Sequence, residues 1–119
     1  MMALLVTFIT YSSNAQISNT KWKGTLNIQG GSMDVDFNFS NDTLDIINTS
    51  ENQSLETMKY TVADSVLSLQ KLYGNSSCDT AIGKYKYAMT GNEMVISLIS
   101  DGCSQRSDAI GTLKLKKEE

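Results

Sequence analysis

The sequence has no histidine and no proline, and it contains a single arginine, Arg106, and a single tryptophan, Trp22. Without histidine there is no Ser-His-Asp triad, no histidine-ligated metal site and no imidazole base for neutral pH. The 119 residues carry 10 Lys+Arg against 13 Asp+Glu, which gives a net charge of -3. Such a mildly acidic chain is a poor electrostatic partner for DNA or RNA. We therefore expect one domain with no nucleic-acid partner.

Charge is also absent from the first 15 residues, MMALLVTFITYSSNA. Their apolar run, from Met2 to Tyr11, is too short to span a bilayer, which takes ~20 residues. Ser13 and Ala15 provide the small residues that signal peptidase requires before its cut. These features predict a signal peptide over 1–15 and a mature domain over 16–119, although the run could instead form a buried first strand. With no cysteine near the cut, we expect a soluble secreted or periplasmic product without a lipid anchor or membrane span.

Only two cysteines are present, Cys78 and Cys103, 25 positions apart. In an oxidising compartment an isolated pair of this kind usually forms a disulfide. Closing a loop of this length stabilises a protein by roughly 3 to 4 kcal/mol. Neither cysteine belongs to a CxxC motif, which argues against a redox role.

Apolar and polar residues alternate with period two through most of the remaining chain, and short turns interrupt the pattern. The alternation predicts eight strands, near residues 20–29, 33–40, 43–48, 56–63, 66–72, 83–90, 93–100 and 109–117. No segment shows helical periodicity, so no helix is expected.

Eight antiparallel strands joined by short turns favour an all-β, up-and-down barrel, with an open two-sheet sandwich as the alternative. Each predicted strand has one apolar face, as a single wall around a shared interior requires. The residues predicted to face that interior are Trp22, Leu26, Ile28, Val35, Phe37, Phe39, Met58, Tyr60, Leu67, Tyr85, Tyr87, Met89, Met94, Ile96 and Leu98.

An eight-stranded barrel is either just filled by its own side chains or has room for one small ligand. Buried tyrosine hydroxyls need partners, and methionines adapt to irregular ligands. The candidate pocket residues are therefore Tyr60, Tyr85, Tyr87, Met58, Met89, Met94 and Phe37. The competing interpretation is a solid core in which the same side chains pack together, because short strands leave little room.

Two further patterns fail as catalytic or metal sites. The segment DVDFNFSND resembles the start of a calcium loop, but Phe39 stands where glycine is required and Asp45 where glutamate is required. Asp34 and Asp36 share one face of a predicted strand, but that face points to solvent and nothing marks a cleft. We expect no catalytic residue, no metal and no cofactor, and hence no enzyme.

The signal end NAQ, the segment WKGT (22–25), the eight-strand pattern and the segment DGCSQR (101–106) before a final LKLKK together resemble small lipocalin-like domains of exported Bacteroidetes proteins. In the wider lipocalin family, a first-strand tryptophan packs at the closed end of the barrel beneath an arginine. The resemblance therefore implies that Trp22 and Arg106 stack, a cation–π contact worth ~0.5 to 2 kcal/mol. The chain departs from the family in having W-x-G in place of G-x-W.

The same resemblance implies modification sites. A short motif of Asp, then Ser or Thr, then an apolar residue carries O-glycans in the group resembled. It occurs here at Thr43, Ser65 and Thr80, all in predicted turns or loops.

Three functions remain open. The favoured one is an exported, monomeric binding module that carries a small hydrophobic molecule inside the barrel, as the resemblance implies. The alternatives are a secreted inhibitor of a protease or lysozyme, and an accessory domain without a ligand. An inhibitor would act through its loops or through the N-terminal arm from Gln16 to Thr20.

Overall fold

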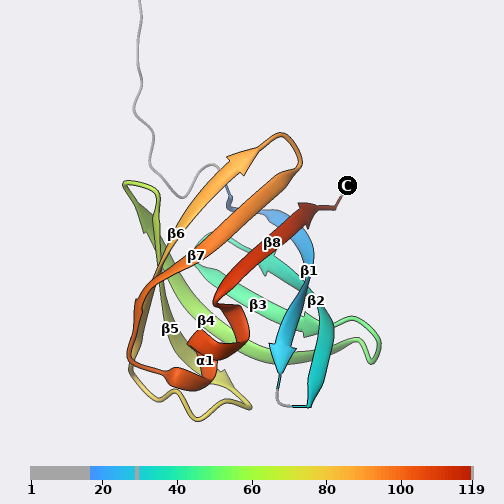
Figure 1. Ribbon diagram of the computed structural model, residues 1–119, viewed down its shortest axis with the longest axis vertical. Coiled ribbons are helices and arrows are strands. Elements are labelled where there is room, and N and C mark those ends of the chain that lie inside the picture. The colour runs from blue at the N-terminus through green and yellow to red at the C-terminus, as the bar shows by residue number, and fades with distance from the viewer. Residues whose placement is uncertain (1–16, 29, 119) are drawn as a thin grey trace, which may run out of the picture.

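The computed structural model describes residues 17–28 and 30–118, which form a closed antiparallel barrel of eight strands in up-and-down order (Figure 1). The predicted fold class is therefore confirmed, whereas the predicted signal peptide lies outside the described residues. The strands are β1 (Thr20–Ile28), β2 (Gly31–Phe39), β3 (Thr43–Asn48), β4 (Gln53–Ala63), β5 (Val66–Gly74), β6 (Ile82–Thr90), β7 (Glu93–Asp101) and β8 (Thr112–Lys117).

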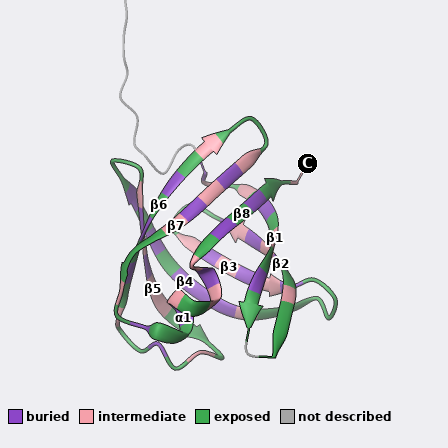
Figure 2. Ribbon diagram, viewed as in Figure 1, coloured by how far each residue is buried: buried purple, intermediate pink, exposed green. Residues whose placement is uncertain are grey.

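The barrel follows from the alternation in the sequence, because successive side chains of a strand point to opposite faces. Buried and exposed residues alternate along most strands (Figure 2). Tight turns set the register between neighbours. In the β4–β5 turn, Asp64 and Ser65 adopt positive φ angles of 54° and 65°, which suit a two-residue hairpin turn that matches the twist of the strands.

The middle of the barrel is a solid core. Most of the residues predicted to face the interior are buried there, including Trp22, Phe37, Tyr85 and Met94. Met89 is partly buried and packs against this core. The solid-core interpretation therefore holds for this part of the molecule.

Two residues predicted to face the interior are exposed to solvent. Ile28 is 39% exposed and Leu98 is 44% exposed. Ile28 ends β1, beyond the part of that strand that pairs with β8. Leu98 lies past the last β7–β8 pair and beside a register shift in the β6–β7 ladder. Ile28 keeps the inward face of β1 that it shares with Leu26, and it is exposed because the barrel wall opens at that end. The prediction for Leu98 was wrong, because the pairing of β7 with β8 stops before it.

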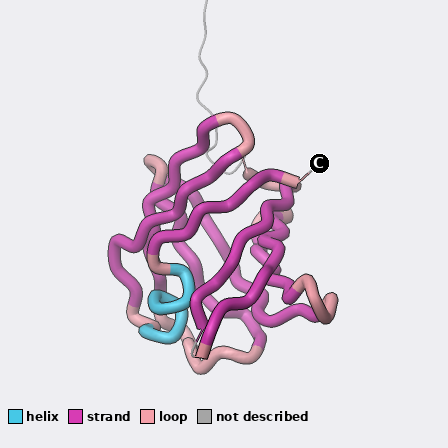
Figure 3. Tube along the Cα trace, turned by 45° about the vertical axis from the view of Figure 1, so that its right-hand side comes forward, coloured by secondary structure: helices cyan, strands magenta, loops and turns pink. Residues whose placement is uncertain are grey.

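A short helix that the sequence did not predict covers this end of the barrel. The helix α1 (Ser104–Ile110) lies between β7 and β8 and contacts both β1 and β7 (Figures 1 and 3). Its seven residues are too few for a recognisable helical period. Two of them, Arg106 and Ile110, are buried and anchor it. Among the described residues, no helix is long and apolar enough to cross a membrane.

The opposite end of the barrel is closed by the residues that precede and begin β1. Ile17 is fully buried, and the Trp22 indole N–H donates to Thr20 Oγ1 over 2.9 Å. The Tyr60 hydroxyl donates to the Ser40 carbonyl over 2.6 Å at the same end. The two ends therefore differ: one is packed shut, and the other is covered only by α1 and the β5–β6 loop.

Candidate functional site

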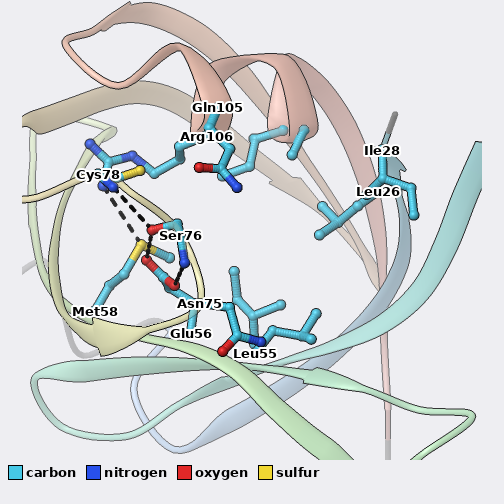
Figure 4. Close-up of a pocket in the computed structure, with 13 residues that line it drawn as sticks. Leu26, Ile28, Leu55, Glu56, Met58, Asn75, Ser76, Cys78, Gln105 and Arg106 are labelled. Atoms are coloured by element: carbon cyan, nitrogen blue, oxygen red, sulfur yellow. Dashed lines mark hydrogen bonds between the residues drawn. The ribbon is translucent and has the colours of Figure 1, made fainter. Parts of the chain in front are cut away.

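A cavity of about 200 Å³ lies at the end of the barrel that α1 covers (Figure 4). The strands β1, β3 and β4, the β5–β6 loop and α1 all contribute to its wall. Leu26, Ile28 and Leu55 stand on one side of it, and Glu56, Ser76 and Arg106 stand on the other. The complete lining is Leu26, Ile28, Ile46, Leu55, Glu56, Met58, Asn75, Ser76, Cys78, Gln105, Arg106, Ala109 and Ile110.

Glu56 is the acidic residue in this wall, and its side chain is buried, with 8% of the residue exposed. One carboxylate oxygen accepts the Ser76 backbone N–H over 3.1 Å, and the other accepts the Ser76 hydroxyl. In the described part of the chain, no Lys or Arg nitrogen lies within ion-pair distance of Glu56. The nearby Lys71 ammonium donates to the Ser76 carbonyl instead. Glu56 is thus a buried, hydrogen-bonded carboxylate without a counterion.

Irregularities in the sheet flank Glu56 on both sides. The β3–β4 register shifts between Ile46 and Ile47, and the β4–β5 register shifts between Thr57 and Met58. Such bulges bend a strand and re-aim its side chains, and they are frequent beside functional sites. Glu56 lies on the same inward face of β4 as Met58 and Tyr60, and the two shifts stand on either side of it.

Gly74 makes the space that the Glu56 side chain occupies. It pairs with Glu56 across β4 and β5. A Cβ atom at Gly74 would overlap a Glu56 carboxylate oxygen and would stand 2.6 Å from the Glu56 Cα. Its φ of 143° is also one that residues with a side chain rarely adopt. The glycine is therefore required by the position of Glu56.

We expect Gly74→Ala to lower the free energy of unfolding by about 1 to 3 kcal/mol, because the added methyl group overpacks against backbone atoms of β4. Gly91→Ala is the matched control, since Gly91 also has a positive φ but has open space around it. Urea unfolding of the two variants measures the difference. Equal losses of unfolding free energy in the two variants would mean that the overlap with Glu56 does not add to the cost of Gly74→Ala.

A buried polar network stands beside the cavity and fixes α1. Arg106 Nε and Nη2 each donate over 2.8 Å to the Asp101 carboxylate, and Nη2 also donates to the Ala81 carbonyl. Asp101 accepts further hydrogen bonds from the Tyr85 hydroxyl and the Cys103 backbone N–H. The network joins α1 to β6, β7 and the loop before β6.

The network also determines the charge state of its members. Burial alone would raise the pKa of Asp101, but hydrogen bonds from Arg106, Tyr85 and the Cys103 backbone, together with the arginine charge, hold that pKa below its usual value. Burial and the hydrogen bond to Asp101 raise the pKa of Tyr85 far above its usual value. Asp101 is therefore a charged carboxylate at neutral pH, neutralised by Arg106 and not available to a ligand.

Of the seven candidate pocket residues, the cavity at α1 is lined by Met58 alone. The hydroxyls of Tyr60 and Tyr85 already have protein partners, Ser40 and Asp101. Burial and the Asp42 charge raise the pKa of Tyr60 to about 12. Burial raises the pKa of Tyr87 as well. The other four, which are Phe37, Tyr87, Met89 and Met94, belong to or pack against the solid core.

Trp22 and Arg106 do not form the cation–π stack that the resemblance implied. Arg106 binds Asp101 and the Ala81 carbonyl, and no cation–ring contact joins it to Trp22. The reason is topological. Trp22 pairs with Lys117 at the far end of β8, whereas Arg106 belongs to the helix that precedes the start of β8. The two side chains therefore lie at opposite ends of the barrel.

The predicted disulfide is present, and it fastens the cavity cover. Cys78 and Cys103 are bonded, with their Cα atoms 5.2 Å apart. The bond joins the β5–β6 loop to the residue that precedes α1. Gln105 adds a second link, because its Oε1 accepts the Ser77 backbone N–H and the Ser77 hydroxyl, each over 3.0 Å. The loop and the helix thus form one cover.

The candidate glycosylation residues lie away from this cover or on its outside. Ser65 and Thr80 are exposed, and Thr43 at the start of β3 is half-buried. Within the described ranges, no group of three or more Cys, Asp or Glu residues is placed to hold a metal ion.

Sequence reasoning missed most of the cavity lining. Glu56 continues the alternation of Met58 and Tyr60, but it was not among the residues predicted to face the interior, all of which are apolar or aromatic. In contrast, Asn75, Gln105 and the rest of the cover come from a loop and a short helix, which have no periodic pattern to read.

No protein-family model, no curated protein and no solved structure matches this chain, so the cavity itself is the basis for assigning a function.

Proposed function

We propose that this domain is a non-enzymatic binding module for a small molecule with an apolar body and one polar group. The supporting observation is the cavity at α1, which has an apolar side and a polar side (Figure 4). Its volume of about 200 Å³ limits the size of the ligand. An engineered apolar cavity of about 150 Å³ takes up benzene, whereas drug-sized pockets start near 300 Å³. A ligand with one ring or a short chain fits.

The disulfide supports a location outside the cytoplasm, because such bonds persist in oxidising compartments. The alternative function, an inhibitor acting through its N-terminal arm, gains no support from the described part of that arm. Ile17 is fully buried there, so the segment packs on the barrel and does not project from it.

Filling the cavity is expected to abolish binding. Ala109 lines the cavity from α1 and is only partly exposed, so Ala109→Phe puts a ring into the space. Ala88→Phe, on the outer face of β6, is the matched control. With benzyl alcohol as the probe, ligand-observed NMR should detect binding to the wild type and to Ala88→Phe but not to Ala109→Phe. Equal binding by all three proteins would place the ligand elsewhere.

A further inference from the structure

The charges around the cavity do not balance. Arg106 and Asp101 form an ion pair with 2.8 Å between their atoms, so together they contribute no net charge. Glu56 remains, and the groups that donate hydrogen bonds to its carboxylate are the neutral N–H and hydroxyl of Ser76. Lys71 does not line the cavity, and its ammonium group binds the Ser76 carbonyl. The wall of the cavity therefore carries one unneutralised negative charge.

A buried carboxylate without a counterion is costly, and folded proteins rarely keep one. Here the sequence holds it in place with specific features. Gly74 leaves room for the side chain, register shifts flank it, and Ser76 donates two hydrogen bonds to it. A neutral residue at this position would pack against the apolar wall without needing the space at Gly74 or the hydrogen bonds from Ser76. Their presence indicates that the charge meets a partner from outside the chain.

We propose that the ligand is a small primary amine, whose ammonium group pairs with Glu56 while its apolar body lies against Leu26, Ile28 and Leu55. This inference rests on the proposed function, since it names the class of molecule that the cavity takes. A carboxylate has about four acceptor positions, and Ser76 uses one on each oxygen. Two positions remain for an ammonium group, which carries three donors. The surrounding apolar side chains strengthen the attraction by excluding water.

Three probes of similar shape and different charge test the inference on the unmodified protein. Benzylamine, benzyl alcohol and benzoate are titrated separately and followed by NMR. The expected affinity order is benzylamine, then benzyl alcohol, with no binding of benzoate. If benzyl alcohol binds as tightly as benzylamine, the amine preference is wrong and the proposed function stands. If none of the three binds, both proposals are wrong.

Glu56→Gln then assigns the preference to this residue. The change keeps the shape of the side chain and removes its charge, so benzylamine affinity should fall about thirtyfold or more. Benzyl alcohol affinity should fall much less than benzylamine affinity, because the glutamine carbonyl oxygen still accepts a hydrogen bond from the hydroxyl. The remaining binding also shows that the variant keeps its cavity. Equal losses for both probes would mean that Glu56 maintains the fold only. A benzylamine affinity unchanged in Glu56→Gln would place the ammonium group away from this carboxylate.

Discussion

Replacing Arg106 by alanine should lower the free energy of unfolding by about 3 to 5 kcal/mol, because it leaves the Asp101 carboxylate buried without its counterion. The side chains of the two residues are 5% and 0% exposed, so water cannot replace the lost interaction. A domain of this size has a total stability of about 5 to 15 kcal/mol. The variant therefore loses a large share of its stability, and urea unfolding measures it.

The matched control is Lys114→Ala on β8, an exposed cation for which a change within about 0.5 kcal/mol is expected. A loss below about 1 kcal/mol in Arg106→Ala would contradict the view that this network holds α1 on the barrel. Tyr85→Phe removes one hydrogen bond to Asp101 and should cost about 1 kcal/mol.

The same network has a pH signature. The pKa of Asp101 is lower in the folded protein than its usual value, so the folded state favours the charged form. The stabilisation is complete above the unfolded pKa, near 3.9, and is lost as pH falls through the lower folded pKa. We therefore expect the urea midpoint of unfolding, measured at several pH values from 7 to 2, to stay constant down to about pH 4 and to decrease at lower pH. Asp101→Asn should weaken that drop.

Removing the disulfide is the other change with a large expected effect. The 25-residue separation of Cys78 and Cys103 gives a loss of about 3.5 kcal/mol from loop-closure entropy in the unfolded chain. A Cys78→Ser, Cys103→Ser double variant, or the wild type in a strong reductant, should unfold at a correspondingly lower urea concentration. The reductant should not change the urea midpoint of the double variant, which would show that it acts on the wild type only by breaking the disulfide.

Ligand binding should weaken along with stability, because the bond fastens the β5–β6 loop to α1 over the cavity. Loss of stability without any loss of benzyl alcohol binding would show that the loop holds its position without the bond. Stability equal to that of the wild type would mean that the unfolded chain gains no freedom when the bond is broken.

The strands could be predicted from sequence because each rests on a local pattern. A residue such as Phe37 has polar neighbours on both sides, and that alternation alone fixes its face. The exception, Leu98, lies where β7 is no longer paired with β8. Whether β7 is paired at a given residue depends on where β8 begins. The alternation within β7 does not show where β8 begins.

The site was harder to predict because its residues come together only in the closed barrel. Tyrosines seemed suited to a pocket, but Tyr60 and Tyr85 find partners within the protein. The unusual feature is an acidic residue, Glu56, in an inward position of β4, and the strand pattern did not identify it because the inward set on that strand was taken to begin at Met58. Glu56 becomes part of a cavity only because α1 covers that end of the barrel, and the sequence did not predict α1.

The most direct test of the cavity as a binding site is a two-dimensional amide NMR spectrum of the ¹⁵N-labelled domain during a benzylamine titration. The expected result is a set of shifts confined to the end of β1, the middle of β3, the first half of β4, the β5–β6 loop and α1. Amides at the opposite end, around Trp22 and Ser40, should not move. Shifts spread over the outer faces of the strands, or no shifts with millimolar benzylamine or with millimolar benzyl alcohol, would contradict a ligand site in this cavity.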